Sequence, residues 1–153
     1  MDLRKINFKS LLFYSLIPLM LGFIVAMIIP DYRDFYSSLN KPFNLPAIVF
    51  PIVWSILYVV MGIAAYFVDE EGDDKAIRLY YIQLFVNLLW TPVFFGLKSL
   101  LWGMIVALFL AILVILTAIK FYQSRKLSGY LMIPYVIWSL FALYLTISIY
   151  ALN

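Results

Sequence analysis

The residues of this sequence best suited to chemistry are aromatic. Trp54, Tyr58 and Gly62 follow one another at intervals of four, which places them on one face of a helix. Trp90 and Trp138 lie in two other apolar segments. Indole and phenol rings give flat apolar surfaces with one polar group at the edge. This pattern predicts stacking surfaces for a large, flat, apolar molecule.

Most other site chemistry is excluded by composition. The sequence has no cysteine and no histidine. It therefore lacks thiolates, the commonest metal ligand, the commonest general base and the usual haem ligand. General acid–base catalysis would depend on loop carboxylates such as Asp31 or Asp34. No metal site is predicted, no constellation for ground-state catalysis is present, and enzymatic activity stays an open question.

The elements that carry these residues are long and apolar. The chain is 66% hydrophobic and 12% charged, whereas a soluble domain is about half apolar and a quarter charged. Five segments of at least 19 residues contain no charge: 10–30, 42–68, 79–97, 99–119 and 127–153. About 20 residues cross a bilayer as a helix, and lipid requires that backbone groups be satisfied internally. We expect an all-α integral membrane protein with a five-transmembrane-helix bundle, formed by one domain over residues 1–153.

The expected helices cover about 10–30, 46–68, 77–97, 99–122 and 128–151. The first segment follows Arg4, Lys5 and Lys9, as in a signal peptide, but 10–30 has no small-x-small cleavage site. We expect a retained helix. Loop 31–45 is expected to form a lid over the bundle, because prolines at 42, 46 and 51 each remove a backbone donor and fix φ.

Loop charges favour a cytoplasmic N-terminus. Basic residues gather on the cytoplasmic side of multi-pass proteins. In this orientation eight basic residues lie inside and only Arg33, Lys41 and Lys98 lie outside. No basic stripe suits nucleic acid. The eight inside residues are Arg4, Lys5, Lys9, Lys75, Arg78, Lys120, Arg125 and Lys126.

Four features have two interpretations each. Asn87 is an amide at membrane depth, so it hydrogen-bonds a neighbouring helix or the backbone, or else it contacts a ligand. The small residues Ser99, Gly103, Ala107 and Ala111 recur every four positions, which suits close packing within the bundle or a homodimer seam. Near a membrane boundary, Trp102 is more often a belt residue than a ligand contact. In the last apolar segment, the small Ala142 beside Trp138 opens space for a flat ligand or accommodates a neighbouring helix.

Taken in order, several motifs resemble the TspO/MBR family, which includes the translocator protein and bacterial tryptophan-rich sensory proteins. The resemblance covers nearly the whole chain from about Phe35. The motifs are Leu39-x-Lys41-Pro42, Val49-Phe50-Pro51-x-x-Trp54-x-x-Leu57-Tyr58-x-x-Met61-Gly62, Asn87-x-x-Trp90-x-Pro92-x-Phe94-Phe95-Gly96, Trp102, and Pro134-Tyr135-x-x-Trp138-x-x-Phe141-Ala142-x-x-Leu145.

Two departures from the family pattern alter the expectations. The loop reads Lys41-Pro42-Phe43-Asn44-Leu45-Pro46, one residue shorter than the usual pattern and without its tryptophan. The final helix has Tyr150 but no basic residue after it, so the sterol motif of animal members is incomplete. An altered lid would change ligand preference more than fold.

The resemblance implies a five-helix bundle, often a homodimer, with a pocket roofed by the first long loop. It implies binding of porphyrins such as protoporphyrin IX and haem, and of benzodiazepine-site ligands, with no required cofactor. It also implies light-dependent porphyrin degradation in some members, with roles for Trp54 and Trp138. The expected ligand-binding residues are Tyr36, Pro46, Phe50, Trp54, Tyr58, Asn87, Trp90, Phe94, Trp102, Trp138, Ala142 and Leu145.

We therefore expect a receptor- or sensor-type protein, integral and multi-pass in a bacterial cell membrane. Its partners would be porphyrin-type molecules, the lipid bilayer and a second copy in a homodimer. Arg33 and Lys41 on the lid are suited to the propionates of a porphyrin. The alternatives are light-dependent porphyrin degradation and facilitative tetrapyrrole transport; coupled transport is disfavoured because no ionisable residue lies within a span.

Overall fold

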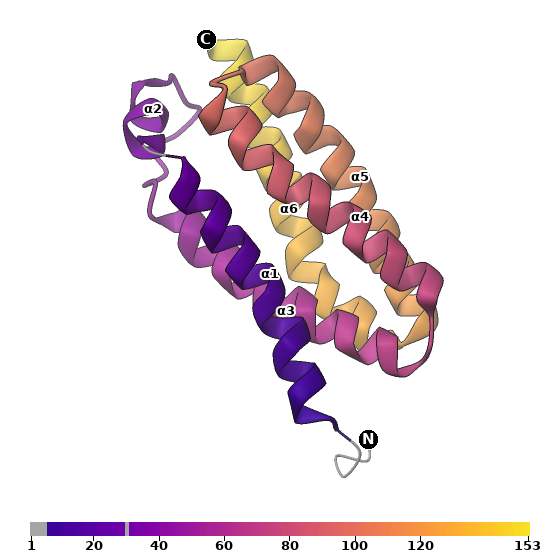
Figure 1. Ribbon diagram of the computed structural model, residues 1–153. Helices are drawn as coiled ribbons and strands as arrows, with labels where there is room; N and C mark the ends of the chain where they lie inside the picture. Colours follow the sequence, from indigo (N-terminus) through magenta and orange to yellow (C-terminus); the bar gives the residue numbers. More distant parts are fainter. Residues whose placement is uncertain (1–5, 30) are drawn as a thin grey trace.

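Within the described residues, five long helices, one short helix and one π-helical turn form the bundle (Figure 1). The computed structural model describes residues 6–29 and 31–153, so the expectations that involve Arg4, Lys5 and Pro30 lie outside the described residues. Every regular element in the described ranges is helical. The elements are α1 (Phe8–Ile28), α2 (Tyr32–Ser38), α3 (Val49–Glu70), α4 (Asp74–Thr91), the π-helical turn η2 (Pro92–Gly96), α5 (Leu100–Ser124) and α6 (Lys126–Leu152).

Five helices are long and apolar enough to cross a membrane, with mean hydropathies from 1.3 to 2.8. The predicted all-α, five-span architecture is thus confirmed. α1 begins at one end of the bundle and α6 ends at the other (Figure 1), as an odd number of crossings requires. Arg125 and Glu71 form an ion pair at 3.2 Å, so the α3–α4 and α5–α6 connections share one end. Which end is cytoplasmic stays a prediction.

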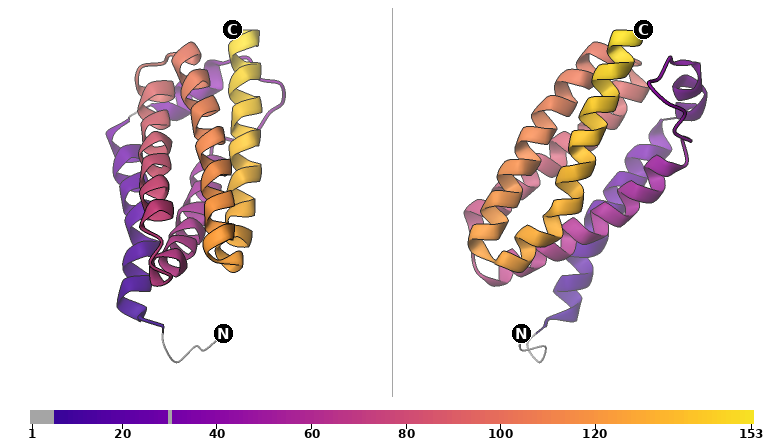
Figure 2. Two further views of the ribbon diagram at one scale, coloured as in Figure 1. Left: turned by 90° about the vertical axis from the view of Figure 1, so that its right-hand side faces the viewer. Right: turned by 180° about the vertical axis from the view of Figure 1, so that it is seen from behind.

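The helices form a ring in which α1 is the least enclosed member. The two views of Figure 2 show α4, α5 and α6 side by side, with α1 and α3 along the other flank. In α1 only 11% of the membrane-spanning window is buried within the protein, against 33–39% in the other four spans. α1 packs chiefly on α3, where Gly62 lies directly against the backbone of Tyr14. A glycine at this position allows the two backbones to meet.

The small residues of α5 are used within the bundle. Ala107 and Ala111 are 4% and 3% exposed, and a Cβ on Gly103 would overlap the ring of Phe94. The stripe therefore accommodates neighbouring helices of the same chain. A homodimer stays a prediction that would need another surface.

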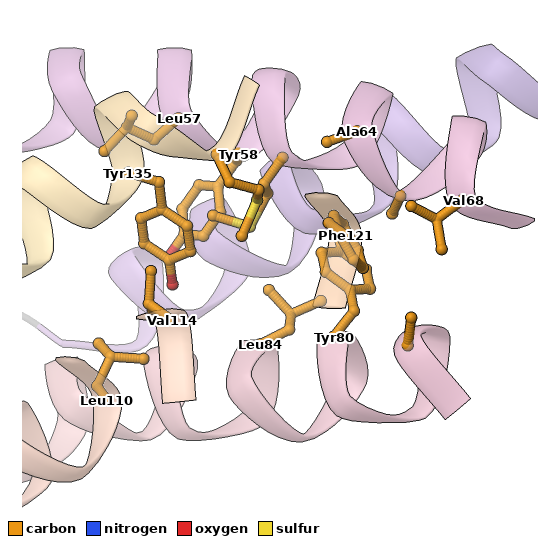
Figure 3. Close-up of a cluster of buried hydrophobic side chains, with 14 residues drawn as sticks. Leu57, Tyr58, Ala64, Val68, Tyr80, Leu84, Leu110, Val114, Phe121 and Tyr135 are labelled. Atoms are coloured by element: carbon orange, nitrogen blue, oxygen red, sulfur yellow. The ribbon is translucent and has the colours of Figure 1, made fainter. Parts of the chain in front are cut away.

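One end of the bundle holds a tightly packed core (Figure 3). Side chains of α3, α4, α5 and α6 meet there, and Val114, Phe121 and Met132 are completely buried. A second apolar cluster joins Tyr36, Phe50, Trp90, Phe94 and Leu145 nearer the lid. The first cluster fixes the bundle, and the candidate site borders the second.

The expected lid contains a helix that the sequence did not predict. Residues 32–38 form α2, and α3 begins at Val49 and not near position 46. The Lys41 ammonium donates hydrogen bonds to the carbonyls of Tyr36 (2.8 Å) and Leu39 (2.7 Å). A cation at the carbonyl end stabilises a helix that is too short to be stable alone.

Candidate functional site

A cavity of about 440 Å³ lies between α1, α3 and the end of α4, close to α2. This volume is within the usual range for small-molecule sites. No ionisable carboxylate, lysine or arginine lines it. The lining residues are Leu19, Met20, Gly22, Phe23, Ala26, Ile29, Tyr32, Phe50, Pro51, Trp54, Ser55, Tyr58, Trp90, Thr91 and Phe95.

Stacked aromatic rings form two parts of the cavity wall. The rings of Trp54 and Tyr58 lie 5.7 Å apart at an interplanar angle of 30°. Trp90 stacks on Phe94 at 5.1 Å and 15°. The intervals of four in α3 therefore do place Trp54 and Tyr58 together. Their rings present flat apolar surface to a molecule within the membrane.

A second, much smaller cavity of about 10 Å³ lies beneath α2. Phe50, Trp90 and Phe95 line both cavities, so these three rings form a shared wall. The other lining residues are Tyr36, Phe94, Ala142, Leu145, Thr146 and Ile149. The space expected as one pocket is thus divided in two.

The predicted site residues fall into four groups. Phe50 and Trp90 line both cavities. Trp54 and Tyr58 line only the larger cavity. Tyr36, Phe94, Ala142 and Leu145 line only the smaller one. Four predicted residues line neither of these two cavities: Pro46, Asn87, Trp102 and Trp138.

The four residues outside the two cavities have other surroundings. Trp102 is 60% exposed, as expected for a belt residue. Pro46 is exposed in the connection before α3. Trp138 packs between Phe50 and Phe141, with ring centroids 6.1 and 5.1 Å away.

Asn87 belongs to a buried hydrogen-bond network. Its Oδ1 accepts from the Tyr58 hydroxyl at 2.7 Å, and its Nδ2 donates to the Tyr135 hydroxyl at 2.6 Å. The Tyr135 hydroxyl donates in turn to Gln83 Oε1 at 2.7 Å. The network joins α3, α4 and α6, which favours the interpretation of Asn87 as an interhelical contact. It also fixes Tyr58 beneath Trp54.

Sequence reasoning missed the contribution of α1. Five of the residues that line the larger cavity come from this helix, including Gly22 and Ala26, and Ile29 follows directly after it. A Cβ on Gly22 would overlap the ring of Tyr58. The sequence did contain one signal of this contact. Gly22 and Ala26 are small and four positions apart, so they leave room on one face of α1 for a facing aromatic ring.

Comparison with known proteins agrees with this architecture. The model of the TspO/MBR family matches residues 14–152. The chain is 40% identical to the tryptophan-rich sensory protein of Cereibacter sphaeroides over 74% of this chain and 72% of the relative. It is 40% identical to protein CrtK of Rhodobacter capsulatus over 77% and 78%. It is 34% identical to the human translocator protein over 69% and 67%.

This chain belongs to the TspO/MBR family. It is a membrane protein of the sensory and translocator type, integral and multi-pass. The family resemblance inferred from the motifs is confirmed. A bacterial cell membrane stays the expected location.

The lid of this TspO/MBR chain is tied to α6. The Asn153 side chain accepts from the Asn40 backbone N–H at 3.0 Å and donates to the Asn40 carbonyl at 2.9 Å. It also donates to the Ile149 carbonyl at 2.8 Å. One amide side chain thus connects the segment after α2 to the last turn of α6.

We predict that Asn153→Ala loosens the lid. Two hydrogen bonds to the Asn40 backbone are lost, so amide hydrogen exchange in segment 39–45 should accelerate about fivefold, as expected for about 1 kcal/mol. Hydrogen exchange with mass spectrometry measures this. Asn44→Ala is the control, because Asn44 is exposed in the same segment. Equal acceleration in both variants would contradict the role of Asn153.

Proposed function

We propose that this chain is a receptor- or sensor-type membrane protein that binds porphyrins, such as protoporphyrin IX and haem, and benzodiazepine-site ligands. The observation that carries the proposal is the 440 Å³ aromatic cavity inside the membrane-spanning bundle. A porphyrin is a large flat π-system with an apolar body and acidic edges. Its body matches an apolar lining in which Trp54 stacks on Tyr58 and in which Trp90 is supported from behind by Phe94.

The acidic edge has a candidate partner at the lid. Tyr32 lines the cavity, and its hydroxyl accepts a hydrogen bond from Arg33 Nε at 3.1 Å. Arg33 is exposed, so its guanidinium can meet a propionate at the membrane surface. Lys41 is less suited to this role, because it already caps α2. With no histidine or cysteine in the sequence, the proposal for haem is stacking without strong axial ligation.

A dark titration of the purified protein with protoporphyrin IX tests the proposal. We expect a saturable shift of visible absorbance. Trp54→Leu should weaken binding about fivefold, because it removes a stacking surface of the cavity. Trp102→Leu is the matched control and should leave the affinity unchanged, since Trp102 is 60% exposed and outside both cavities.

Two outcomes would contradict porphyrin binding at this site. One is the absence of saturation in the wild type. The other is an equal loss of affinity in the two variants, which would indicate non-specific partition onto exposed aromatic surface.

A second candidate function is light-dependent porphyrin degradation. It is favoured by the position of Trp54, which lines the cavity and stacks on Tyr58. An excited porphyrin would use a pocket tryptophan as its redox partner. Illumination should bleach bound porphyrin in the wild type and spare it in Trp54→Phe. Trp138→Phe should protect the porphyrin less than Trp54→Phe does. Equal bleaching in all three proteins would leave only non-specific photodamage.

A further inference from the structure

The facing sides of α1 and α3 are in closest contact at the end of the bundle away from the lid. Gly62 of α3 lies there directly against the backbone of Tyr14. One turn nearer the lid, the ring of Tyr58 spans the space between the two helices and lies directly against Gly22. A side chain fills at this level the space that two backbones share at Gly62. The two helices therefore move apart toward the lid.

Nearer the lid, the seam between α1 and α3 is open. Ala26 and Ser55 continue the two facing sides, both line the larger cavity, and both side chains are exposed. Phe23 lines the same cavity and is 64% exposed. The opposite wall is closed, since Tyr58 and Trp90 are 7% and 8% exposed. The larger cavity thus opens sideways between α1 and α3.

This opening lies within the membrane-spanning helices. Ala26 belongs to the span Phe8–Ile28 and Ser55 to the span Val49–Glu70. The Ser55 hydroxyl donates to the Pro51 carbonyl at 2.6 Å, so it is already satisfied within its own helix. No charged side chain of the described residues lines the cavity. Hydrocarbon is therefore the medium that meets the opening.

The water-facing end of the larger cavity is covered by α2. Tyr32 packs edge-on against Phe95, with ring centroids 5.8 Å apart. Phe35 packs against Phe94 and Phe95 at 6.0 and 6.3 Å. A molecule from the water must displace this packed cover, whereas a molecule from the bilayer need not.

The size and lining of the cavity suit one acyl chain. Its volume is about 440 Å³. A methylene group is similar in size to a water molecule, whose share of the liquid is about 30 Å³, so the cavity has room for roughly a dozen methylene groups. An acyl chain needs no hydrogen bond or counter-ion, and it gains dispersion contacts with the aromatic walls. A charged headgroup would find no partner in the lining.

We propose that the larger cavity is a lateral site for one acyl chain of a membrane phospholipid, which enters between Ala26 and Ser55. The headgroup stays at the membrane surface, and the chain contacts Trp54. Packing holds the chain, because it leaves one apolar medium for another and gains nothing from the hydrophobic effect. The acyl-chain site shares its walls with the proposed porphyrin site, but it does not depend on porphyrin binding.

Quenching of tryptophan fluorescence by brominated lipid tests the acyl-chain site. The protein is placed in nanodiscs of phosphatidylcholine with bromine in the middle of its acyl chains, and in nanodiscs of the same lipid without bromine. Bromine quenches an indole ring on contact, so the ratio of the two intensities reports which tryptophans touch acyl chains. All variants carry Trp102→Phe, because Trp102 is 60% exposed and is quenched from outside the bundle.

We expect brominated lipid to quench this parent protein. Trp54→Phe should remove about half of the quenching, since Trp54 and Trp90 both line the cavity and quenching requires contact at van der Waals distance. Ser55→Phe should reduce the quenching at least about twofold, because the larger side chain obstructs the opening. Ile56→Phe is the matched control and should leave the quenching unchanged. Ile56 is the next residue, is 58% exposed and lies outside the cavity lining.

Two results would overturn the acyl-chain site. Unchanged quenching in Trp54→Phe would mean that water or a second copy of the protein covers the seam. Equal quenching in Ser55→Phe and Ile56→Phe, with equal unfolding midpoints, would rule out entry between α1 and α3. The proposed function fails separately: an absence of porphyrin saturation with the Trp54 quenching intact would contradict porphyrin binding alone. Porphyrin saturation without Trp54 quenching would contradict the acyl-chain site alone.

Discussion

Gly62→Ala is expected to displace α1 and to destabilise the protein by about 2–3 kcal/mol. A Cβ at position 62 would overlap the backbone carbonyl oxygen of Tyr14 and lie 2.8 Å from the Ser15 Cα. Backbone atoms have no rotamer with which to move aside, so the whole helix must shift. Thermal unfolding in detergent should show a midpoint about 5–10 °C lower.

The effect on the site should be larger than the effect on the core. α1 is the least buried span and provides five of the residues that line the larger cavity. If α1 moves outward, the cavity widens and the stacking partners of the ligand separate. We therefore expect Gly62→Ala to bind protoporphyrin IX at least about tenfold more weakly.

Gly96→Ala provides the matched control. The nearest heavy atoms to a Cβ at position 96 are 3.9–4.0 Å away, which is ordinary contact distance. Alanine has a higher helix propensity than glycine by about 1 kcal/mol. Helix propensity alone would therefore make Gly62→Ala more stable, and a loss of stability must come from the contact with α1. Equal stability of the two variants would mean that α1 and α3 are not in close contact.

The architecture was predictable because lipid leaves few choices. Charge-free segments of 19 residues or more must form spanning helices, and the structure has all five. α2 was not predictable in the same way. Its seven residues mix polar and aromatic side chains and are too few for a stable isolated helix, so it depends on Lys41 and on packing of Tyr36.

The candidate site was predictable only in part. Spacing placed Trp54 beside Tyr58, since the helical period fixes which residues share a face. The division into two cavities depends on the orientation of Phe50, which stands between Tyr36 and Trp138. Side-chain orientation is decided by packing between helices, and no periodicity encodes it.

Asn87→Leu is expected to destabilise the protein by about 2 kcal/mol. The substitution removes the acceptor of the Tyr58 hydroxyl and the donor to the Tyr135 hydroxyl, while Tyr135 keeps its bond to Gln83. An interhelical hydrogen bond in a membrane protein contributes about 1 kcal/mol to stability. The Tyr58 hydroxyl, buried without its acceptor, adds a further destabilisation. The thermal unfolding midpoint should fall by about 4–8 °C.

A double-mutant cycle with Tyr58→Phe separates the two costs. In Asn87→Leu/Tyr58→Phe no Tyr58 hydroxyl is left without an acceptor, so the double variant should be more stable than the sum of the single losses predicts. Strict additivity would mean that the 2.7 Å bond between Tyr58 and Asn87 contributes nothing.

The same variants decide between the two interpretations of Asn87. If Asn87 acts by holding Tyr58 beneath Trp54, then Asn87→Leu and Tyr58→Phe should weaken porphyrin binding to a similar, small extent, about two- to threefold. Their loss of affinity should accompany the loss of stability. A ligand contact at Asn87 would give a different result: a large loss of affinity in Asn87→Leu alone, with the unfolding midpoint unchanged. Because Asn87 lines neither cavity and its amide is bonded to two tyrosines, we expect the first result.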